Sequence, residues 1–266
     1  MADTYTHGHH ESVLRSHQWR TAQNSAAYLL PYLRPESRIL DIGCGPGTIT
    51  ADLAGYVPGG EIVGIEPDEA IVAKARTEAA GRGVPNARFE TGDVYALDHP
   101  DGAFDVVHAH QVLQHLTDPV AALREMRRVC APGGYVAARD ADYAAMTWYP
   151  EVPGLTEWLD LYERVARGND AEPDAARHML AWARAAGFTE ITPTASVWCH
   201  ATPEDRAYWG GMWADRIVSS SIADQARDRG LATDADLRRI SEAWRTWAAD
   251  DDGWFAILHG EILCRA

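Results

Sequence analysis

Long apolar runs and paired cysteines are both missing from this sequence of 266 residues. No run of about 18 apolar residues occurs, so we expect no membrane-spanning helix. No basic region followed by an apolar core stands near the first residues, so we expect no secretory signal. The four cysteines form no Cys-x-x-Cys pair, which favours a cytoplasmic protein with free thiols.

Positive charge is also scarce, because 24 Lys and Arg residues face 39 Asp and Glu residues for a formal net charge of −15. A field of this sign repels phosphate backbones and anionic lipid. We therefore expect neither nucleic acid nor a membrane as partner, and we expect a small-molecule substrate. The sequence carries no signal for an oligomeric state.

The strongest positive signal is a segment with three closely spaced glycines. An apolar strand ending at Asp41 runs into Gly43, Gly45 and Gly47, and a helical pattern follows. Glycines let the backbone approach a ligand, and a helix N-terminus favours a negative group. Thr48 stands where the dinucleotide fingerprint would have its third glycine, which argues against a nicotinamide cofactor.

Strands alternate with helices as far as about residue 140, and this rhythm predicts a parallel sheet with helices on both faces. After that point two strands are separated by a long helical stretch. We expect one domain with three parts: an N-terminal helical cap at 1–34, with a helix at 11–33, a cofactor-binding half at 35–140, and a substrate-side half at 141–266 with a helical lid at about 203–252.

Polar side chains follow successive predicted strands, at the sheet edge where ligands of such sheets bind. Asp41, Glu66, Asp93 and His110 all occupy such positions. An acid after the second strand typically holds two ribose hydroxyls. Asp93 could accept from the amine of a base, and Asp41 could face an ammonium group. The predicted ligand therefore combines a base, a ribose and a cationic amino-acid tail.

The chain resembles the class I S-adenosylmethionine-dependent methyltransferases, in the broad ubiquinone/menaquinone-biosynthesis-like group that acts on small molecules. The resemblance covers residues 37–140 and rests on motifs in the family's order, namely Leu40-Asp41-Ile42-Gly43-Cys44-Gly45-Pro46-Gly47, Gly64-Ile65-Glu66-Pro67, Gly92-Asp93-Val94, Phe104-Asp105-Val106-Val107 and Pro132-Gly133-Gly134. It implies a Rossmann-like, doubly wound α/β fold whose seven-stranded sheet has an antiparallel last strand, with a helical insertion before that strand.

The resemblance also implies S-adenosylmethionine as cofactor and a set of residues that contact it. The expected cofactor-binding residues are Asp41, Gly43, Cys44, Gly45, Gly47, Thr48, Glu66, Pro67, Asp93, Val94 and His110. Cys44 is interpreted as a small filler of the loop, because methyl transfer from a sulfonium needs no thiol nucleophile.

The expected reaction is in-line displacement at the methyl carbon, with the acceptor aligned by the protein and in some cases deprotonated. Histidine suits the role of base because its pKa lies near neutrality. His110 is the first candidate and His115 the second, four residues after Gln111 on a predicted helical face; His108 shares the face of His110.

Four further groups of residues follow from position alone. Asp140 and Asp142 are interpreted first as an exposed loop and second as a base or weak metal site, and no metal is expected. An aromatic substrate wall is expected from Tyr143, Trp148, Trp209, Met212 and Trp213, and closure of the site from Tyr5, Trp19 or Arg20. His7, His9 and His10 are interpreted as part of a capping segment.

Three alternatives compete with a small-molecule methyltransferase. A NAD-dependent oxidoreductase shares the strand, the loop and the ribose acid. A non-catalytic S-adenosylmethionine-binding protein would carry the same motifs. Methylation of a nucleic-acid base typically needs an Asn/Asp-Pro-Pro-aromatic motif after the fourth strand, where this chain has His110-Gln111-Val112-Leu113.

Overall fold

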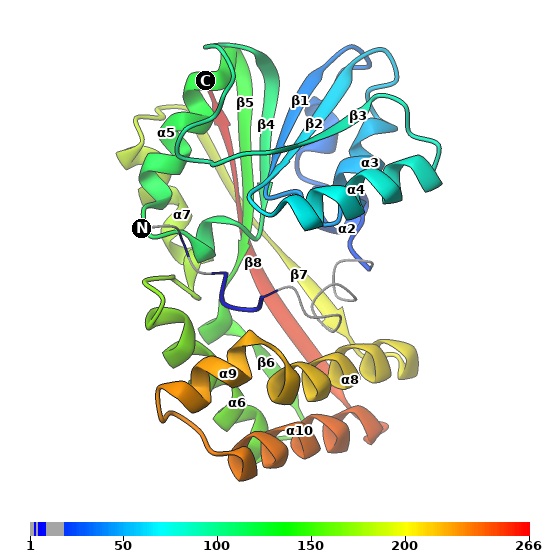
Figure 1. The fold of residues 1–266 in the computed structure, drawn as a ribbon, viewed down its shortest axis with the longest axis vertical. Coiled ribbons are helices and arrows are strands. Elements are labelled where there is room, and N and C mark those ends of the chain that lie inside the picture. The colour runs from blue at the N-terminus through cyan, green and yellow to red at the C-terminus, as the bar shows by residue number, and fades with distance from the viewer. Residues whose placement is uncertain (1–2, 4, 9–18) are drawn as a thin grey trace.

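The computed structural model describes residues 3, 5–8 and 19–266. In this part of the chain one sheet of eight strands runs through the molecule, with neighbours in the order β3-β2-β1-β4-β5-β8 and with β6 and β7 both paired to β8 (Figure 1). The strands are β1 (Arg38–Ile42), β2 (Glu61–Glu66), β3 (Ala87–Thr91), β4 (Phe104–His110), β5 (Cys130–Ala141), β6 (Thr147–Tyr149), β7 (Ile191–His200) and β8 (Trp254–Arg265).

The first five strands are parallel, and β8 is antiparallel to β5, β6 and β7. The helices are α2 (Ala22–Ser25), α3 (Thr48–Ala54), α4 (Glu69–Gly81), α5 (Pro119–Val129), α6 (Pro153–Arg167), α7 (Ala175–Ala185), α8 (Pro203–Ser219), α9 (Ser221–Asp228) and α10 (Asp234–Ala249). Short 3₁₀ turns occur at η1 (Leu30–Tyr32), η2 (Leu113–His115) and η3 (Tyr143–Ala145).

Alternation along β1 shows how the sheet is covered on both faces. Leu40 and Ile42 belong to the core shared with α5 and α7, whereas Ile39 points to the opposite core, with Leu53 of α3. All four side chains are at most 2% exposed. Because each such side chain stabilises the fold by about 1.5–3 kcal/mol when buried, both faces must be covered by helices.

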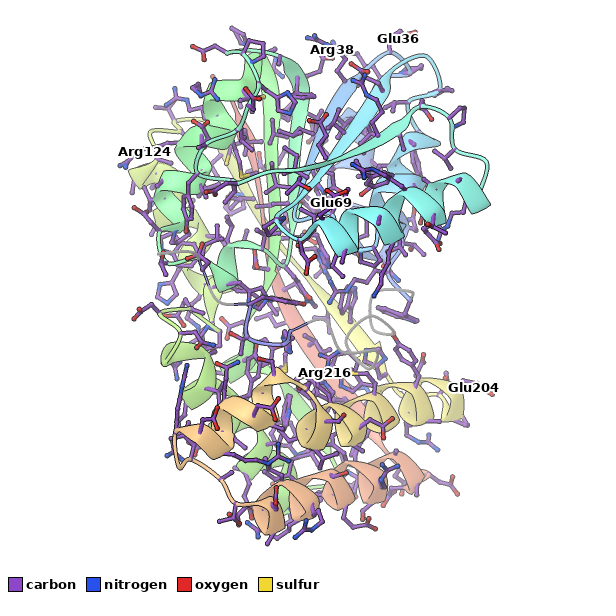
Figure 2. The ribbon with its side chains drawn as sticks, viewed as in Figure 1. Glu36, Arg38, Glu69, Arg124, Glu204 and Arg216 are labelled. Atoms are coloured by element: carbon purple, nitrogen blue, oxygen red, sulfur yellow. The ribbon has the colours of Figure 1, made fainter. Side chains whose placement is uncertain are left out.

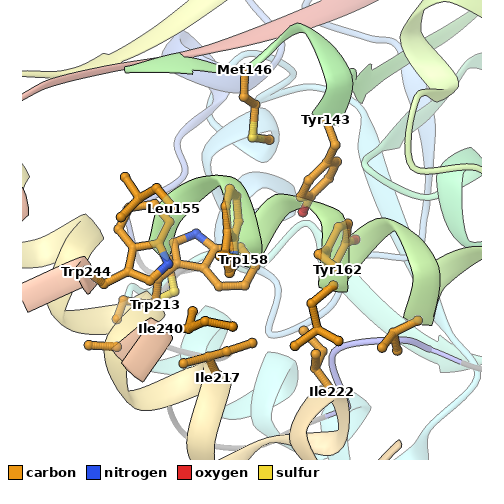
Figure 3. Close-up of a cluster of buried hydrophobic side chains, with 14 of the residues drawn as sticks. Tyr143, Met146, Leu155, Trp158, Tyr162, Trp213, Ile217, Ile222, Ile240 and Trp244 are labelled. Atoms are coloured by element: carbon orange, nitrogen blue, oxygen red, sulfur yellow. The ribbon is translucent and has the colours of Figure 1, made fainter. Parts of the chain in front are cut away.

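A second layer of helices lies beyond one end of the sheet, as Figure 1 shows for α6, α8, α9 and α10. Its core is aromatic, and Figure 3 shows Trp158, Trp213 and Trp244 packed together beside Tyr162. Trp158 and Trp213 meet edge to face with ring centroids 4.6 Å apart. Strands β7 and β8 continue from the sheet into this layer and join the two parts (Figure 1).

The predicted fold class is confirmed, including the antiparallel last strand and the helical insertion, which is α8 to α10 between β7 and β8. The sheet has one strand more than expected, because residues 147–149 pair with Trp254–Ala256 of β8. The predicted continuous N-terminal helix is wrong for residues 19–33. Thr21 caps a single turn at α2, and Pro31 lies in the separate turn η1, which starts at Leu30. Residues 11–18 lie outside the described residues.

Candidate functional site

A cavity of about 320 Å³ lies where the strand ends of the parallel sheet face the helical layer, a size that suits a small ligand. At one end it is lined by the predicted cofactor-binding residues Gly43, Gly45, Glu66, Pro67, Asp93 and Val94. At the other end it is lined by His110, His115, Tyr143, Trp209 and Trp213. Residues predicted from separate motifs therefore share one space.

The glycine loop needs its glycines for backbone conformation and for close packing. Gly43 has φ +63°, and a Cβ there would lie 2.5 Å from Cγ2 of Val112. Gly47 has φ +83° at the N-cap of α3, and a Cβ there would lie 2.9 Å from the Phe89 ring. Both positions are in the left-handed region that L side chains rarely adopt. Gly47 does not line the cavity, so its glycine serves the strand-to-helix turn.

Asp41 lies beneath the glycine loop, and both of its carboxylate oxygens have hydrogen-bond partners within the protein. Its Oδ2 accepts from the Thr50 hydroxyl at 2.5 Å, and its Oδ1 is 2.8 Å from Nδ1 of His108. Asp41 and His108 are 3% and 0% exposed. Asp41 therefore holds the base of the loop and does not line the cavity. Cys44 and Thr48 are also buried and lie outside the lining, as Gly47 does.

Glu66 ends β2 and lies beside the loop, where its Oε2 accepts the Gly45 N–H at 3.2 Å. The side chain is nearly buried and lines the cavity. Burial raises the pKa of Glu66 to about 7, although the Gly45 bond partly opposes this effect. Its carboxylate can accept hydrogen bonds from two neighbouring hydroxyls of a ligand.

His110 ends β4 and faces the cavity at 6% exposure. Neither ring nitrogen has a hydrogen-bond partner among the described residues. Burial lowers the pKa of His110 well below its usual range, and Arg139 adds to this effect. The ring packs against Trp198 of β7, with centroids 5.5 Å apart. A neutral imidazole whose two ring nitrogens have no partner in the described chain can donate one hydrogen bond to a ligand and accept another.

His115 reaches the cavity through a turn, not through the predicted helical face. Gln111 has φ +53°, which ends β4 sharply, and the following helical turn spans only Leu113–His115. Burial lowers the pKa of His115 to about 3. Gln111 itself was not predicted as a lining residue. Its Oε1 accepts from Nη2 of Arg20 at 2.6 Å, which brings Arg20 to the cavity wall.

The described N-terminal residues close one side of the cavity. Thr6 is fully buried, and its Oγ1 accepts from Nδ2 of Asn169 at 3.2 Å. His7 lines the cavity, and its Nε2 is 3.2 Å from the Tyr162 hydroxyl. The Tyr5 ring lies edge to face with His115 at 4.9 Å. His9 and His10 lie outside the described residues. Across the described part of the chain no cluster of His, Cys, Asp or Glu is arranged for a metal.

Several predicted positions lie outside the cavity lining. Trp148 of β6 stacks on Phe255 with ring centroids 5.7 Å apart, and Trp19 packs edge to face against Trp198. Met212 is buried in the core of the helical layer and does not line the cavity, because the lining face of α8 passes through Trp209, Trp213 and Arg216. Arg216 was missed, although its spacing of seven from Trp209 places it on that face. The exposed-loop interpretation of 140–142 is wrong, because both acids there are buried.

These acids have partners inside the protein. Asp140 accepts the Gln114 N–H at 3.2 Å, and burial raises its pKa to about 7. Asp142 is bound by the Arg177 guanidinium. Neither lines the cavity. They hold η2 and α7 against the end of β5 and are not placed to act on a ligand there.

Comparisons with known proteins agree with this geometry. Residues 33–216 match the family model described as a methyltransferase domain. The chain is 38% identical over 270 residues to an uncharacterised methyltransferase of Schizosaccharomyces pombe, covering 97% of this chain and 95% of that protein. It is 30% identical over 286 residues to the probable methyltransferase LtbC of Aspergillus luteorubrus, covering 99% and 97%.

Solved structures share the fold at lower identity. The YcgJ protein of Bacillus subtilis matches with a TM-score of 0.57 at 22% identity, covering 97% of this chain and 98% of that one. A phosphoethanolamine N-methyltransferase of Haemonchus contortus, solved with S-adenosyl-L-methionine, matches with a TM-score of 0.56 at 18% identity, covering 90% of this chain and 51% of that one.

Proposed function

The chain belongs to the class I S-adenosylmethionine-dependent methyltransferases, and from this premise we propose that its acceptor is a small molecule bound between the sheet and the helical layer. The chain is an enzyme that transfers a methyl group from S-adenosylmethionine. The observation that carries the proposal is the cavity, which has the glycine loop at one end and buried aromatic rings at the other. The nicotinamide alternative is excluded by the family match.

For the methyl donor we propose a residue set along the first half of the cavity. Glu66 would hold the ribose hydroxyls, Asp93 and Val94 would contact the adenine, and the loop at Gly43 would receive the methionine tail. Arg20 suits the carboxylate of that tail. Its Nε is buried without a hydrogen-bond partner in the described chain, so an oxyanion would complete its hydrogen bonds.

For the acceptor we propose the space beneath α8. The lining rings of Tyr143, Trp209 and Trp213 are at most 8% exposed, and the described N-terminal residues cover the same side. A polymer could not thread such a buried wall without displacing these elements. We therefore assign residues 35–140 to the donor and 141–266 to the acceptor, with 203–252 as the lid. The cytoplasmic location stays a prediction.

When bound, S-adenosylmethionine supplies a methyl carbon already activated by a positive sulfur. The chain has to align the acceptor with that carbon and exclude water, and alignment alone can lower the barrier by roughly 7–11 kcal/mol. His110 lines the cavity and remains neutral at neutral pH, because burial lowers its pKa. We propose that His110 and His115 orient the acceptor by hydrogen bonding, since imidazoles with lowered pKa are weak bases.

The test separates an enzyme from a binding protein. Calorimetry should show that S-adenosylhomocysteine binds the purified chain, and mass spectrometry should show a gain of one methyl group in a member of a small-molecule extract. Glu66→Gln should weaken binding, and Glu69→Gln, an exposed change on α4, should not. Binding with no methylated product from any extract would leave the protein a non-catalytic binder. Methylation of RNA or DNA in place of small molecules would refute the proposed acceptor class.

A further inference from the structure

Three hydrogen-bonded side chains, which we call the relay, connect the interior of the sheet to the wall of the cavity. Nε2 of His259 lies 2.9 Å from Nε2 of Gln111, and Oε1 of Gln111 accepts from Nη2 of Arg20 at 2.6 Å. Gln111 and Arg20 line the cavity, whereas His259 is fully buried outside the lining. Figure 2 shows side chains filling this junction between the sheet and the helical layer, with Arg216 on the helical side.

One arrangement of protons satisfies all the contacts of the relay. The amide nitrogen of Gln111 only donates, so Nε2 of His259 accepts from it and carries no proton. The ring proton is then on Nδ1, which lies 3.1 Å from the Ile257 carbonyl and donates to it. Burial lowers the pKa of His259 well below its usual range, and Arg139 adds to this effect, so the ring is neutral at neutral pH. With its nitrogen bound to His259, the amide turns its oxygen toward Arg20.

The backbone of Gln111 is bent to make this bridge. Gln111 has φ +53°, a conformation that few residues other than glycine adopt, and its N–H donates to the Arg139 carbonyl at 2.7 Å. Strand β5 lies between β4 and β8, so the Gln111 side chain reaches across β5 to His259. Asparagine would suit this backbone better, but it is shorter by a methylene group. A glutamine in this strained position is therefore explained by the distance that its amide has to span.

The hydrogen bond to Gln111 fixes the direction of the Arg20 guanidinium. Arg20 precedes α2, in a stretch that belongs to no helix or strand. Its guanidinium carbon lies 5.7 Å from the centroid of the Trp198 ring, and nearby phenols and Asp140 also affect its charge. Such contacts constrain direction less than a hydrogen bond does. A guanidinium has five N–H donors, so Arg20 can bind Gln111 through Nη2 and still offer its Nε N–H to a ligand.

We propose that His259 is a positioning residue for the methyl donor, because it holds Arg20, through Gln111, in the direction that binds the carboxylate of the methionine tail. This inference rests on the proposed function, which assigns that carboxylate to Arg20. Without the acceptor nitrogen of His259, the Gln111 amide could rotate and turn its nitrogen toward Arg20. Two donors would then face each other, and the guanidinium would lose its fixed direction.

The experiment compares two ligands that share the adenosine part. S-adenosylhomocysteine carries the amino-acid tail, and 5′-methylthioadenosine lacks it. Calorimetry on the full chain gives both dissociation constants, and their ratio measures the binding of the tail. Arg20→Met should lower the preference for S-adenosylhomocysteine about tenfold or more, because a charge-assisted bond is lost. His259→Phe and Gln111→Leu should each lower it about fivefold and leave 5′-methylthioadenosine within about twofold of its parent affinity.

Two further results distinguish positioning from structural support. In a chain that already carries Arg20→Met, the addition of His259→Phe should lower the preference no further, because the relay acts only through Arg20. His259→Gln should recover part of the preference, because its amide oxygen can accept from Gln111 as Nε2 of the ring does. A residue that only supported the fold would weaken both ligands and would be insensitive to the state of Arg20.

A matched control is His200→Phe on the neighbouring strand β7. His200 is also fully buried, stacks on Trp209 with ring centroids 4.6 Å apart and does not line the cavity. This variant removes a buried imidazole from the same region without touching the relay. It should keep the parent preference for S-adenosylhomocysteine over 5′-methylthioadenosine.

The outcomes separate the two proposals. If S-adenosylhomocysteine does not bind the parent chain, the proposed donor site is wrong. If Arg20→Met loses the preference while His259→Phe keeps it, the relay proposal is wrong and the donor site stands. If Arg20→Met keeps the preference, Arg20 does not bind the tail and the relay proposal is also wrong. Equal weakening of both ligands by His259→Phe would make His259 a structural residue. If that variant does not fold, Gln111→Leu supplies the ratio, and a parent-like preference there would overturn the proposal.

Discussion

Replacing Glu66 by Gln should make the free protein more stable and a poorer binder. The amide keeps the shape and can still accept the Gly45 N–H, but it carries no charge. Burial raises the pKa of Glu66 from 4.5 to about 7, which corresponds to a cost of about 3 kcal/mol for the ionised side chain in the folded protein.

The sign of the effect follows from proton binding. Between its unfolded and folded pKa values, Glu66 retains its proton in the folded state and loses it in the unfolded state. The free energy of unfolding of the parent therefore falls, relative to Glu66→Gln, as the pH rises from 4.5 to about 7. The two proteins should be about equally stable below this window. Above it, Glu66→Gln should be more stable by about 2–3 kcal/mol.

Binding should change in the opposite direction. A carboxylate that accepts two ribose hydroxyls forms charge-assisted bonds, so the amide should weaken S-adenosylhomocysteine binding by about tenfold to a hundredfold. Parent affinity should also fall as the pH drops below about 7, because binding must then displace a proton from Glu66. The variant should lack this dependence.

Urea unfolding and calorimetry over a series of pH values provide both measurements on the same samples. Other titrating groups are common to parent and variant, so their contributions cancel in the difference. A stability difference that stays constant with pH would show that Glu66 is not held in a desolvated position. Unchanged ligand affinity would show that the carboxylate does not contact the ribose.

Three further substitutions test the residues that shape and support the site. Gly43→Ala should lower the free energy of unfolding in urea by about 1–3 kcal/mol and weaken S-adenosylhomocysteine binding, because the new Cβ would lie 2.5 Å from Val112 at a residue with positive φ. Unchanged stability would contradict this loop conformation. Trp213→Ala should lower the free energy of unfolding by about 3–5 kcal/mol and leave S-adenosylhomocysteine affinity nearly unchanged. A selective loss of that affinity would argue against placing Trp213 on the acceptor side. His108→Phe should lower the free energy of unfolding by about 1–3 kcal/mol, because Asp41 loses a buried hydrogen-bond partner. The double variant with Asp41→Asn should lose less stability than the sum of the two single variants. Additive losses in urea unfolding would show that the two side chains do not interact.

The donor half was predictable because its signals are local in the chain. An apolar run ending in an acid, then glycines, then a helix, describes β1, the loop and α3 within a few residues. Asp68 directly precedes α4 and caps it, because its side chain accepts the Ala70 N–H at 2.8 Å. Asp118 caps α5 in the same way, through Ala121, ahead of a proline in the first turn.

The features that escaped prediction depend on residues distant in sequence. Strand β6 has three residues and exists through pairing with Trp254–Ala256, about a hundred positions later. Asp140 and Asp142 flank a single alanine just after the apolar part of β5 and have the pattern of a loop, but a turn after β4 folds over Asp140 and donates the Gln114 N–H to it. Arg216 follows Trp213 by three residues and so shares its helical face, yet its position against the cavity depends on how α8 packs.

The two ends of the helical insertion lie side by side. In the register of β7 and β8, His200 is opposite Phe255, so the chain leaves the sheet for α8 and returns from α10 at neighbouring positions. A hairpin turn could join the same two strands. The insertion can therefore be regarded as a cassette whose sequence can diverge, or be exchanged between relatives, without changing the register of the sheet below it. Evolution of a new acceptor preference could then proceed by replacing this cassette while the donor site is inherited intact.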